Sequence, residues 1–281
     1  MLVTLREIKS KTENFFSEKG IPNGKLDTDL ILSSALKLKR LDLYLDLDRP
    51  IYPEELGQMR DMVRRRAMRE PLQYILGETS FFDCTLRVDK RALIPRPETE
   101  LLVEQVLPLL GDAEHILELG TGSGAIVLAI ANAGISAEIT AIDRDPEALA
   151  LAKSNAEALA LKDKITFLES DWLSALSAEK QFDMIISNPP YLSDVLYESA
   201  EPEVKEFEPK QALLAEDSGM SDLKIIMRES FAFLKPEGIL VLETGTDQHG
   251  ELSKEAEKIG YKASKTTKDL NEYDRFLWLY R

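Results

Sequence analysis

Short apolar runs alternate with segments of helical periodicity between residues 115 and 243, and this alternation constrains the fold more than any other feature. The runs lie near residues 115–119, 137–142, 164–169, 182–187 and 237–243. Continuous apolar runs of this kind are typical of strands that are buried on both faces of a sheet. Strands that alternate with helices indicate a parallel sheet covered by helices on both sides, so an α/β fold is predicted.

The end of the chain follows a different pattern. Residues 262–265 and 276–280 are strand-like and flank a charged turn at residues 269–274. A short turn between two strands favours an antiparallel hairpin. We therefore expect a mostly parallel, seven-stranded sheet that closes with this hairpin.

The first eighty residues carry helix signals instead. Thr4 and Glu7 have the spacing of a capping box, and Pro53 opens a further helix. No constellation of chemically reactive residues appears in this part. We expect a small helical accessory domain over residues 1–80, a linker with a β-hairpin over residues 81–96, and an α/β domain over residues 97–281.

Composition restricts the chemistry. Cys84 is the single cysteine, and His115 and His249 are the only histidines, so neither an internal disulfide nor a cysteine- or histidine-rich metal site is predicted. The first ten residues lack the apolar core of a signal peptide, and the nearly apolar stretch at 125–135 is too short to span a bilayer. We expect a cytoplasmic protein that uses no metal and binds no membrane.

Charge is distributed unevenly. Residues 1–80 carry 14 Lys/Arg against 13 Asp/Glu, whereas residues 81–281 carry 21 against 37. Because nucleic acids are bound mainly through Lys and Arg, the acidic second part argues against stable nucleic-acid binding. The dense basic run Arg64–Arg66 with Arg69 is interpreted as the solvated face of a helix.

The motif Asn188-Pro189-Pro190-Tyr191 follows an apolar run and therefore lies at the carboxyl end of a predicted strand, where open α/β sheets bind ligands. Proline has no N–H, so the carbonyls of this segment are left as acceptors. The Asn188 oxygen and a nearby carbonyl can accept both hydrogens of one planar NH2 group, and Tyr191 offers an aromatic face. The motif is predicted to hold a carboxamide or the exocyclic amine of a base; the alternative is a proline-stiffened turn.

A glycine-rich loop, Gly120-Thr121-Gly122-Ser123-Gly124, follows the strand at 115–119. Glycines permit a tight turn and let a ligand lie against bare backbone. Asp143 ends the next strand, where a carboxylate can bind the two hydroxyls of an adenosine ribose. This pattern predicts an adenosine-containing cofactor, but the dinucleotide fingerprint fits it as well.

Asp171 and Trp172 follow the third predicted strand. A short acid at this place can accept the adenine amino group, and the indole can pack on the purine. The alternative for Trp172 is ordinary core packing.

The order of these motifs resembles the class I S-adenosylmethionine-dependent methyltransferases, and the neighbouring sequence resembles the release factor glutamine methyltransferase family (PrmC/HemK type) in particular. The resemblance covers nearly the whole chain. It rests on Ile94–Glu100, Leu119–Ala125, Asp171-Trp172, Ser187–Tyr191, Phe207–Pro209 and Asp217–Met220.

The resemblance implies a Rossmann-like methyltransferase fold and methyl transfer from S-adenosylmethionine to a glutamine side-chain amide. The glutamine would be that of the Gly-Gly-Gln motif in class I peptide chain release factors. By position, the cofactor would be bound by Gly120, Thr121, Gly122, Ser123, Gly124, Asp143, Asp171, Trp172 and Asn188. The substrate glutamine would be held by Asn188, Pro189, Pro190 and Tyr191, with Asn188, Pro189 and Tyr191 taking part in catalysis.

Two other enzyme classes fit part of the pattern. An adenine-N6 amino methyltransferase would use the same amino-group holder, but the acidic second part and the lack of a long basic insert argue against it. A nicotinamide-dependent oxidoreductase would share the glycine loop but would leave Asn188–Tyr191 unexplained. A binding module without catalysis fits least, because both motifs are intact.

Overall fold

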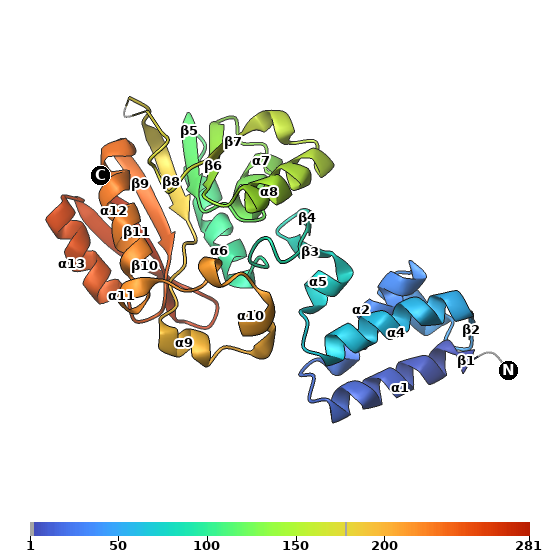
Figure 1. Cartoon of the computed structure of the whole chain (residues 1–281). Coiled ribbons are helices and arrows are strands. Elements are labelled where there is room, and N and C mark those ends of the chain that lie inside the picture. Colours follow the sequence, from blue (N-terminus) through green and yellow to red (C-terminus); the bar gives the residue numbers. More distant parts are fainter. Residues whose placement is uncertain (1–2, 178) are drawn as a thin grey trace. The chain divides into compact units, whose positions relative to one another are not determined.

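The computed structural model describes residues 3–177 and 179–281, and the chain divides into two compact units. The helical unit comprises Met1–Gly77 and Pro202–Phe207. The sheet unit comprises Glu78–Glu201 and Glu208–Arg281. The ribbon in Figure 1 follows the chain through both units.

Seven strands form the central sheet, in the order β10-β11-β9-β8-β5-β6-β7. They are β5 (His115–Leu119), β6 (Glu138–Asp143), β7 (Ile165–Glu169), β8 (Phe182–Ser187), β9 (Leu234–Glu243), β10 (Ala263–Lys268) and β11 (Asp274–Tyr280). The pairs from β7 through β9 are parallel, whereas β11 is antiparallel to both β9 and β10. The predicted α/β fold with its mostly parallel, seven-stranded sheet is confirmed.

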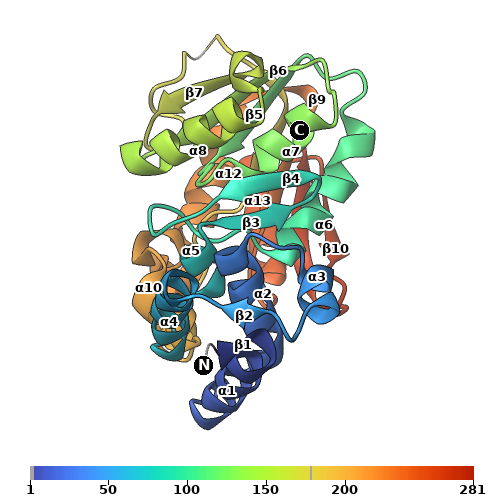
Figure 2. The same ribbon diagram turned by 90° about the vertical axis from the view of Figure 1, so that its right-hand side faces the viewer.

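Helices cover both faces of the sheet because successive strand residues point to opposite sides. Ile116 and Ile186 join one apolar core with α6 (Pro97–Val106) and α7 (Ala125–Asn132). Leu117 and Ile185 join a second core with α12 (Ser221–Phe233) and α13 (His249–Ile259). Figure 2 shows the sheet unit from the side, with helices in front of and behind the strands. The helices of this unit are α6 (Pro97–Val106), α7 (Ala125–Asn132), α8 (Pro146–Ala158), α9 (Asp194–Glu198), α11 (Glu216–Gly219), α12 (Ser221–Phe233) and α13 (His249–Ile259). A hairpin, β3 (Glu78–Phe81) and β4 (Cys84–Arg87), precedes α6.

The chain order reverses at β5. From β5 the chain builds outward through β6 and β7, and then returns to place β8 on the other side of β5. Such a reversal leaves a crevice at the carboxyl ends of the two neighbouring strands, which is where α/β sheets bind ligands. The glycine loop follows β5, Asp143 ends β6 and Asn188 follows β8, so the fold brings all three to this edge.

The helical unit is built on α1 (Leu5–Glu18), α2 (Gly24–Leu36) and α4 (Pro53–Ala67). Thr4 accepts the N–H of Glu7 while the Glu7 carboxylate accepts the N–H of Thr4, which is the predicted capping box. Smaller elements complete the unit: β1 (Val3–Thr4), α3 (Arg40–Leu45), β2 (Pro50–Ile51), α5 (Leu72–Leu76) and α10 (Pro202–Phe207). Of the helices in the described part of the chain, none combines the length and apolar character needed to cross a bilayer.

The basic run at the end of α4 is not wholly a solvated face. Arg66 is only 6% exposed, and its guanidinium donates to Asp27 at 2.7 Å and to Glu203 of α10 at 2.8 Å. Arg69 also donates to Glu203, at 2.6 Å. A buried guanidinium requires such partners to offset its lost hydration. The interpretation as a solvated face is therefore wrong for Arg66, which ties α10 into the helical unit.

Candidate active site

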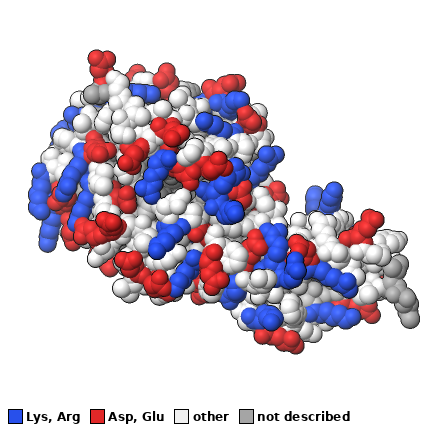
Figure 3. Space-filling model, viewed as in Figure 1, with Lys and Arg blue, Asp and Glu red and all other residues white. Residues whose placement is uncertain are grey.

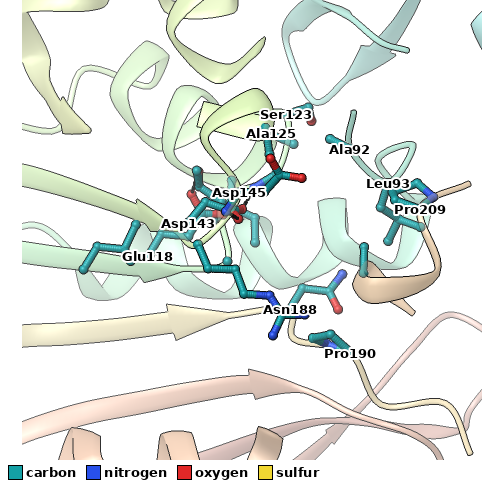
Figure 4. A pocket seen from close by; sticks show the side chains of 18 of the residues that line it. Ala92, Leu93, Glu118, Ser123, Ala125, Asp143, Asp145, Asn188, Pro190 and Pro209 are labelled. Atoms are coloured by element: carbon teal, nitrogen blue, oxygen red, sulfur yellow. Dashed lines mark hydrogen bonds between the residues drawn. The ribbon is translucent and has the colours of Figure 1, made fainter. Parts of the chain in front are cut away.

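A cavity in the sheet unit opens at the carboxyl ends of β5, β6 and β8 (Figure 4). Asp143 and Glu118 lie on one side of it, and Leu93 and Pro209 lie on another. The lining includes eight of the residues singled out in the sequence: Gly120, Thr121, Gly122, Ser123, Asp143, Trp172, Asn188 and Pro190. Gly124, Asp171, Pro189 and Tyr191 are not among the lining residues. Four segments far apart in the sequence thus meet at one place.

The glycine loop is shaped by Asp143. Gly122 has a positive φ of 55° and donates its N–H to Asp143 Oδ2 at 2.8 Å. The N–H of Asp145 donates to the other carboxylate oxygen at 3.0 Å. Burial raises the pKa of Asp143 above its ordinary value, although these two hydrogen bonds oppose the shift. Asp143 therefore both presents an acid to the cavity and fixes the loop beside it.

Glu118 is a buried acid of β5 that also lines the cavity. Its carboxylate accepts hydrogen bonds from the Thr121 hydroxyl and from the N–H of Val127. Burial still raises the pKa of Glu118 to about 8, because lost hydration outweighs the two hydrogen bonds. The ligand-free protein therefore holds Glu118 mostly protonated at neutral pH.

Glu118→Gln is expected to stabilise the ligand-free protein more at pH 8.5 than at pH 5. The pKa of this carboxyl is 4.5 in the unfolded chain and about 8 in the folded protein. In the window between these two pH values the folded protein keeps a proton that the unfolded chain has released. Wild-type stability is therefore full below this window and is lost as the pH rises through it. Glutamine does not titrate. Thermal unfolding of both proteins at the two pH values measures the effect, and an equal difference in Tm at both would contradict it.

The orientation of Asn188 follows from its hydrogen bonds. When Glu243 is ionised, Thr99 of α6 donates its hydroxyl proton to Glu243 Oε2 at 2.7 Å, and this hydroxyl can then only accept from its other neighbour. That neighbour is Asn188, whose Nδ2 donates to Thr99 at 3.1 Å. The amide oxygen of Asn188 is consequently directed away from Thr99. Since Asn188 lines the cavity, this oxygen is left as an acceptor for a ligand.

Tyr191 is held from two directions. Its hydroxyl donates to Glu243 Oε1 at 3.3 Å, and burial raises the Tyr191 pKa, so the phenol stays protonated. Its backbone carbonyl accepts from Gln248 Nε2 at 3.0 Å. Gly219 packs against the same carbonyl so closely that an added Cβ would lie 2.1 Å from the oxygen. Any side chain at Gly219 would therefore displace the Asn188–Tyr191 segment.

A partly buried ion pair, in which Glu208 is the buried partner, lies at another wall of the cavity. Glu208 accepts the N–H of Ile94 at 3.0 Å and is paired with Arg96 at 2.6 Å. Arg96 and Pro209 both line the cavity. The two segments, 94–96 and 208–209, are thereby joined across 112 residues of sequence.

Several site residues were not found by inspection of the sequence. Thr99 and Glu118 line the cavity. Glu243 accepts a hydrogen bond from Thr99, and Gln248 donates one to the carbonyl of Tyr191. Glu118 had a usable signal, since it is an acid in an otherwise apolar strand that leads into a glycine loop. Glu243 had a similar one, because it ends a predicted strand at the ligand-binding edge.

Comparison with known proteins finds relatives along nearly the whole chain. A family described as "Methyltransferase domain" matches residues 110–277, and the PrmC N-terminal domain family matches residues 7–77. A release factor glutamine methyltransferase of Geobacter sulfurreducens is 37% identical over 272 residues, which cover 97% of this chain and 95% of the relative. The corresponding protein of Salmonella typhimurium is 39% identical over 250 residues, which cover 89% of each chain.

Solved structures share the fold at lower identity. A methyltransferase from Pyrococcus furiosus superposes with a TM-score of 0.55 at 20% identity, over 72% of this chain and 90% of that one. A 16S rRNA N2 G1207 methyltransferase of T. thermophilus, solved with AdoMet and guanosine, gives 0.52 at 22% identity, over 73% and 49%. At such identities the likeness shows the methyltransferase fold alone.

Proposed function

This chain belongs to the release factor glutamine methyltransferase family, and we propose that it methylates the side-chain amide nitrogen of the Gly-Gly-Gln glutamine in class I peptide chain release factors. The methyl donor is S-adenosylmethionine. The observation that carries the proposal is Asn188, whose amide oxygen is directed as an acceptor into the cavity by Thr99 and Glu243. No finding supports the alternative of adenine-N6 methylation.

The residues of the cavity fit S-adenosylmethionine. Asp143 presents a carboxylate that suits the two ribose hydroxyls, and Gly120 and Gly122 leave the backbone of the loop bare. Trp172 contributes an aromatic surface beside Gly120, at 3.6 Å from the position of an added Cβ. When bound, the cofactor supplies a methyl group on a positively charged sulfur, which is already an activated donor.

The protein would act mainly by positioning the glutamine. An amide nitrogen is a weak nucleophile, because its lone pair is delocalised into the carbonyl. Holding it in line with the methyl carbon can supply ~7–11 kcal/mol of the barrier reduction. Asn188 Oδ1 and a backbone carbonyl of the Asn188–Tyr191 segment would accept the two amide hydrogens and favour the positive charge that grows on nitrogen. Glu243 is hydrogen-bonded to Thr99 and Tyr191 and does not line the cavity, so the proton would leave to solvent.

Asp143→Ala is expected to weaken S-adenosylmethionine binding at least tenfold. Each hydrogen bond from a ribose hydroxyl to the carboxylate is worth about 1.5–3 kcal/mol, and the variant also loses the acceptor that fixes the N–H of Gly122. Asp145→Ala is a matched control, because it removes another carboxylate from the same cavity, one that caps α8. This variant should bind S-adenosylmethionine much more tightly than Asp143→Ala. Calorimetric titration that gives the wild-type Kd for Asp143→Ala would exclude it from the site.

Transfer of labelled methyl groups tests the proposed substrate directly. The full chain should label an intact class I release factor and should not label a release factor whose Gly-Gly-Gln glutamine is replaced by alanine. Duplex DNA and RNA serve as competing acceptors in the same assay. Label in nucleic acid, with none in the release factor, would overturn the proposal in favour of a base amino methyltransferase.

We further propose that residues 1–80 recognise the release factor beyond its glutamine loop, and that the reaction takes place in the cytoplasm. The motifs assigned to cofactor and amide all lie after residue 80. A loop inserted into a cavity offers little area, whereas a stable protein interface needs about 800 Å² on each partner. The helical unit is the part of the chain left to provide it.

A further inference from the structure

The helical unit contains an open groove between α1 and α4 that no described part of the chain fills. Its volume is about 480 Å³. Both helices pack on α2, with which they build the apolar core of the unit. The apolar lining of the groove includes Ile8, Phe15, Leu56, Met59, Val63 and Met68. We call it the α1–α4 groove.

Its floor is the outer edge of the apolar face by which each helix packs on the core of the unit. Ile8 and Phe15 of α1 are seven positions apart, and Leu56 and Val63 of α4 have the same spacing, so each pair lies on one side of its helix. Ile8, Leu56 and Val63 are partly buried against that core, whereas Phe15 is 36% exposed. Met68, just after α4, is 68% exposed. Two apolar stripes side by side form a hydrophobic groove, which is the surface that an amphipathic helix binds.

The rim of the groove carries only positive charge. Its ionisable residues are Lys11, Lys19, Arg60 and Arg64. Arg64 pairs with its exposed neighbour Asp61, whereas Lys11, Lys19 and Arg60 take part in no ion pair within the described residues. Lys19 lies over the ring of Phe15, 5.8 Å from its centroid. The chain as a whole has a net charge of −15, so this rim is a local exception. Lys and Arg side chains are also prominent over the helical unit on the face viewed in Figure 3.

We propose that the α1–α4 groove binds an amphipathic, acid-flanked helix of the release factor, an inference that rests on the proposed function. Helix α1 is 14 residues long, or ~21 Å, so the groove suits about four turns of a partner helix. Apolar residues of the partner at positions i, i+3, i+4 and i+7 fill the floor, and its Asp and Glu residues face the four cations. Nucleic acid fits less well, because a phosphate backbone is bound through cations and would bury no apolar surface against the floor.

Charge reversal on the rim tests this with the full-length protein. In Lys11→Glu/Arg60→Glu the KM for intact release factor should rise at least fivefold, with kcat and S-adenosylmethionine affinity unchanged. A short peptide that contains the glutamine should be methylated equally by variant and wild type. Phe15→Ser, which alters only the floor, should also raise the KM for release factor and leave the peptide unaffected.

The matched control is Lys25→Glu/Lys39→Glu. It changes the net charge by the same amount on exposed residues of the same unit that do not line the groove. This control should keep the wild-type KM. Because exposed charges are screened by salt, added salt should raise the wild-type KM and leave that of the rim variant nearly constant.

Three outcomes would overturn the inference. They are an unchanged KM in the rim variant, an equal rise in the control, or a rise for the peptide as large as that for release factor. Loss of binding to an RNA hairpin without any change in the release-factor KM would instead assign the groove to nucleic acid. Failure of the wild type to methylate release factor at all would refute the proposed function, and so the two results are distinguishable.

Discussion

Asn188→Ala is expected to lower turnover by about a hundredfold or more while S-adenosylmethionine still binds. The alanine variant lacks the acceptor that orients the substrate amide and interacts with the charge growing on its nitrogen. Removing one preorganised polar group of this kind typically costs ~10²–10³ in kcat. Cofactor affinity should fall much less, because Asp143 and the glycine loop lie on other strands. Single-turnover methylation and calorimetry separate the two effects.

Asn188→Asp provides the matched comparison. The introduced carboxylate keeps an acceptor in the cavity but loses the NH2 group that donates to Thr99 at 3.1 Å. It also meets a hydroxyl whose proton is already given to Glu243. Part of the activity should therefore remain, between the levels of wild type and Asn188→Ala. Wild-type turnover by the alanine variant would show that Asn188 does not hold the amide.

The architecture could be predicted because its signals are local. Each strand of the parallel sheet is a short apolar run, and the observed β5 and β8 have the predicted bounds of 115–119 and 182–187. The position of Asn188 at the sheet edge follows from the strand before it. The glycine loop and Asp143 follow in the same way, because the carboxyl ends of parallel strands share one edge.

The support behind Asn188 could not be predicted, because it joins residues far apart in the sequence. Thr99 is 89 positions from Asn188 and 144 from Glu243. In the sequence, Thr99 is a polar residue near the start of a helix, and Glu243 is an acid at the end of a strand. Neither has a local pattern that reveals its partner. The burial of Arg66 was missed for the same reason, since Glu203 lies 137 positions away.

This support has a consequence for pH dependence. Burial raises the pKa of Glu243 to about 7, against opposing effects from Thr99, Arg275 and Tyr191, while Glu98 adds to the rise. An ionised Glu243 can only accept, and it therefore fixes the Thr99 proton toward itself. A protonated Glu243 can instead donate to Thr99, whose hydroxyl is then free to donate to the oxygen of Asn188. Protonation of Glu243 would thus turn the amide oxygen of Asn188 toward Thr99 and away from the cavity. Because Glu243 ionises as the pH rises, kcat should increase with pH through about 7.

Thr99→Val should remove most of this control of the amide. The variant leaves the NH2 of Asn188 without its acceptor, which costs ~1–3 kcal/mol of stability, and takes one of two hydrogen-bond donors from Glu243, to which Tyr191 still donates. Since misplacing a reacting group can cost up to ~10²-fold in rate, kcat should fall roughly ten- to a hundredfold. S-adenosylmethionine affinity should be unchanged. Thr99→Ser keeps the hydroxyl and should retain near wild-type turnover.

The pH profile distinguishes this positioning role from simple loss of stability. In the wild type and in Thr99→Ser, kcat should increase across neutral pH as Glu243 ionises. In Glu243→Gln this increase in kcat should be absent, because glutamine cannot ionise. In Thr99→Val it should be much reduced, because no hydroxyl then links Glu243 to Asn188 by hydrogen bonds. A lower but parallel profile in Thr99→Val would mean that Thr99 only stabilises the fold. Equal kcat in Thr99→Val and Thr99→Ser would show that Asn188 is oriented without Thr99.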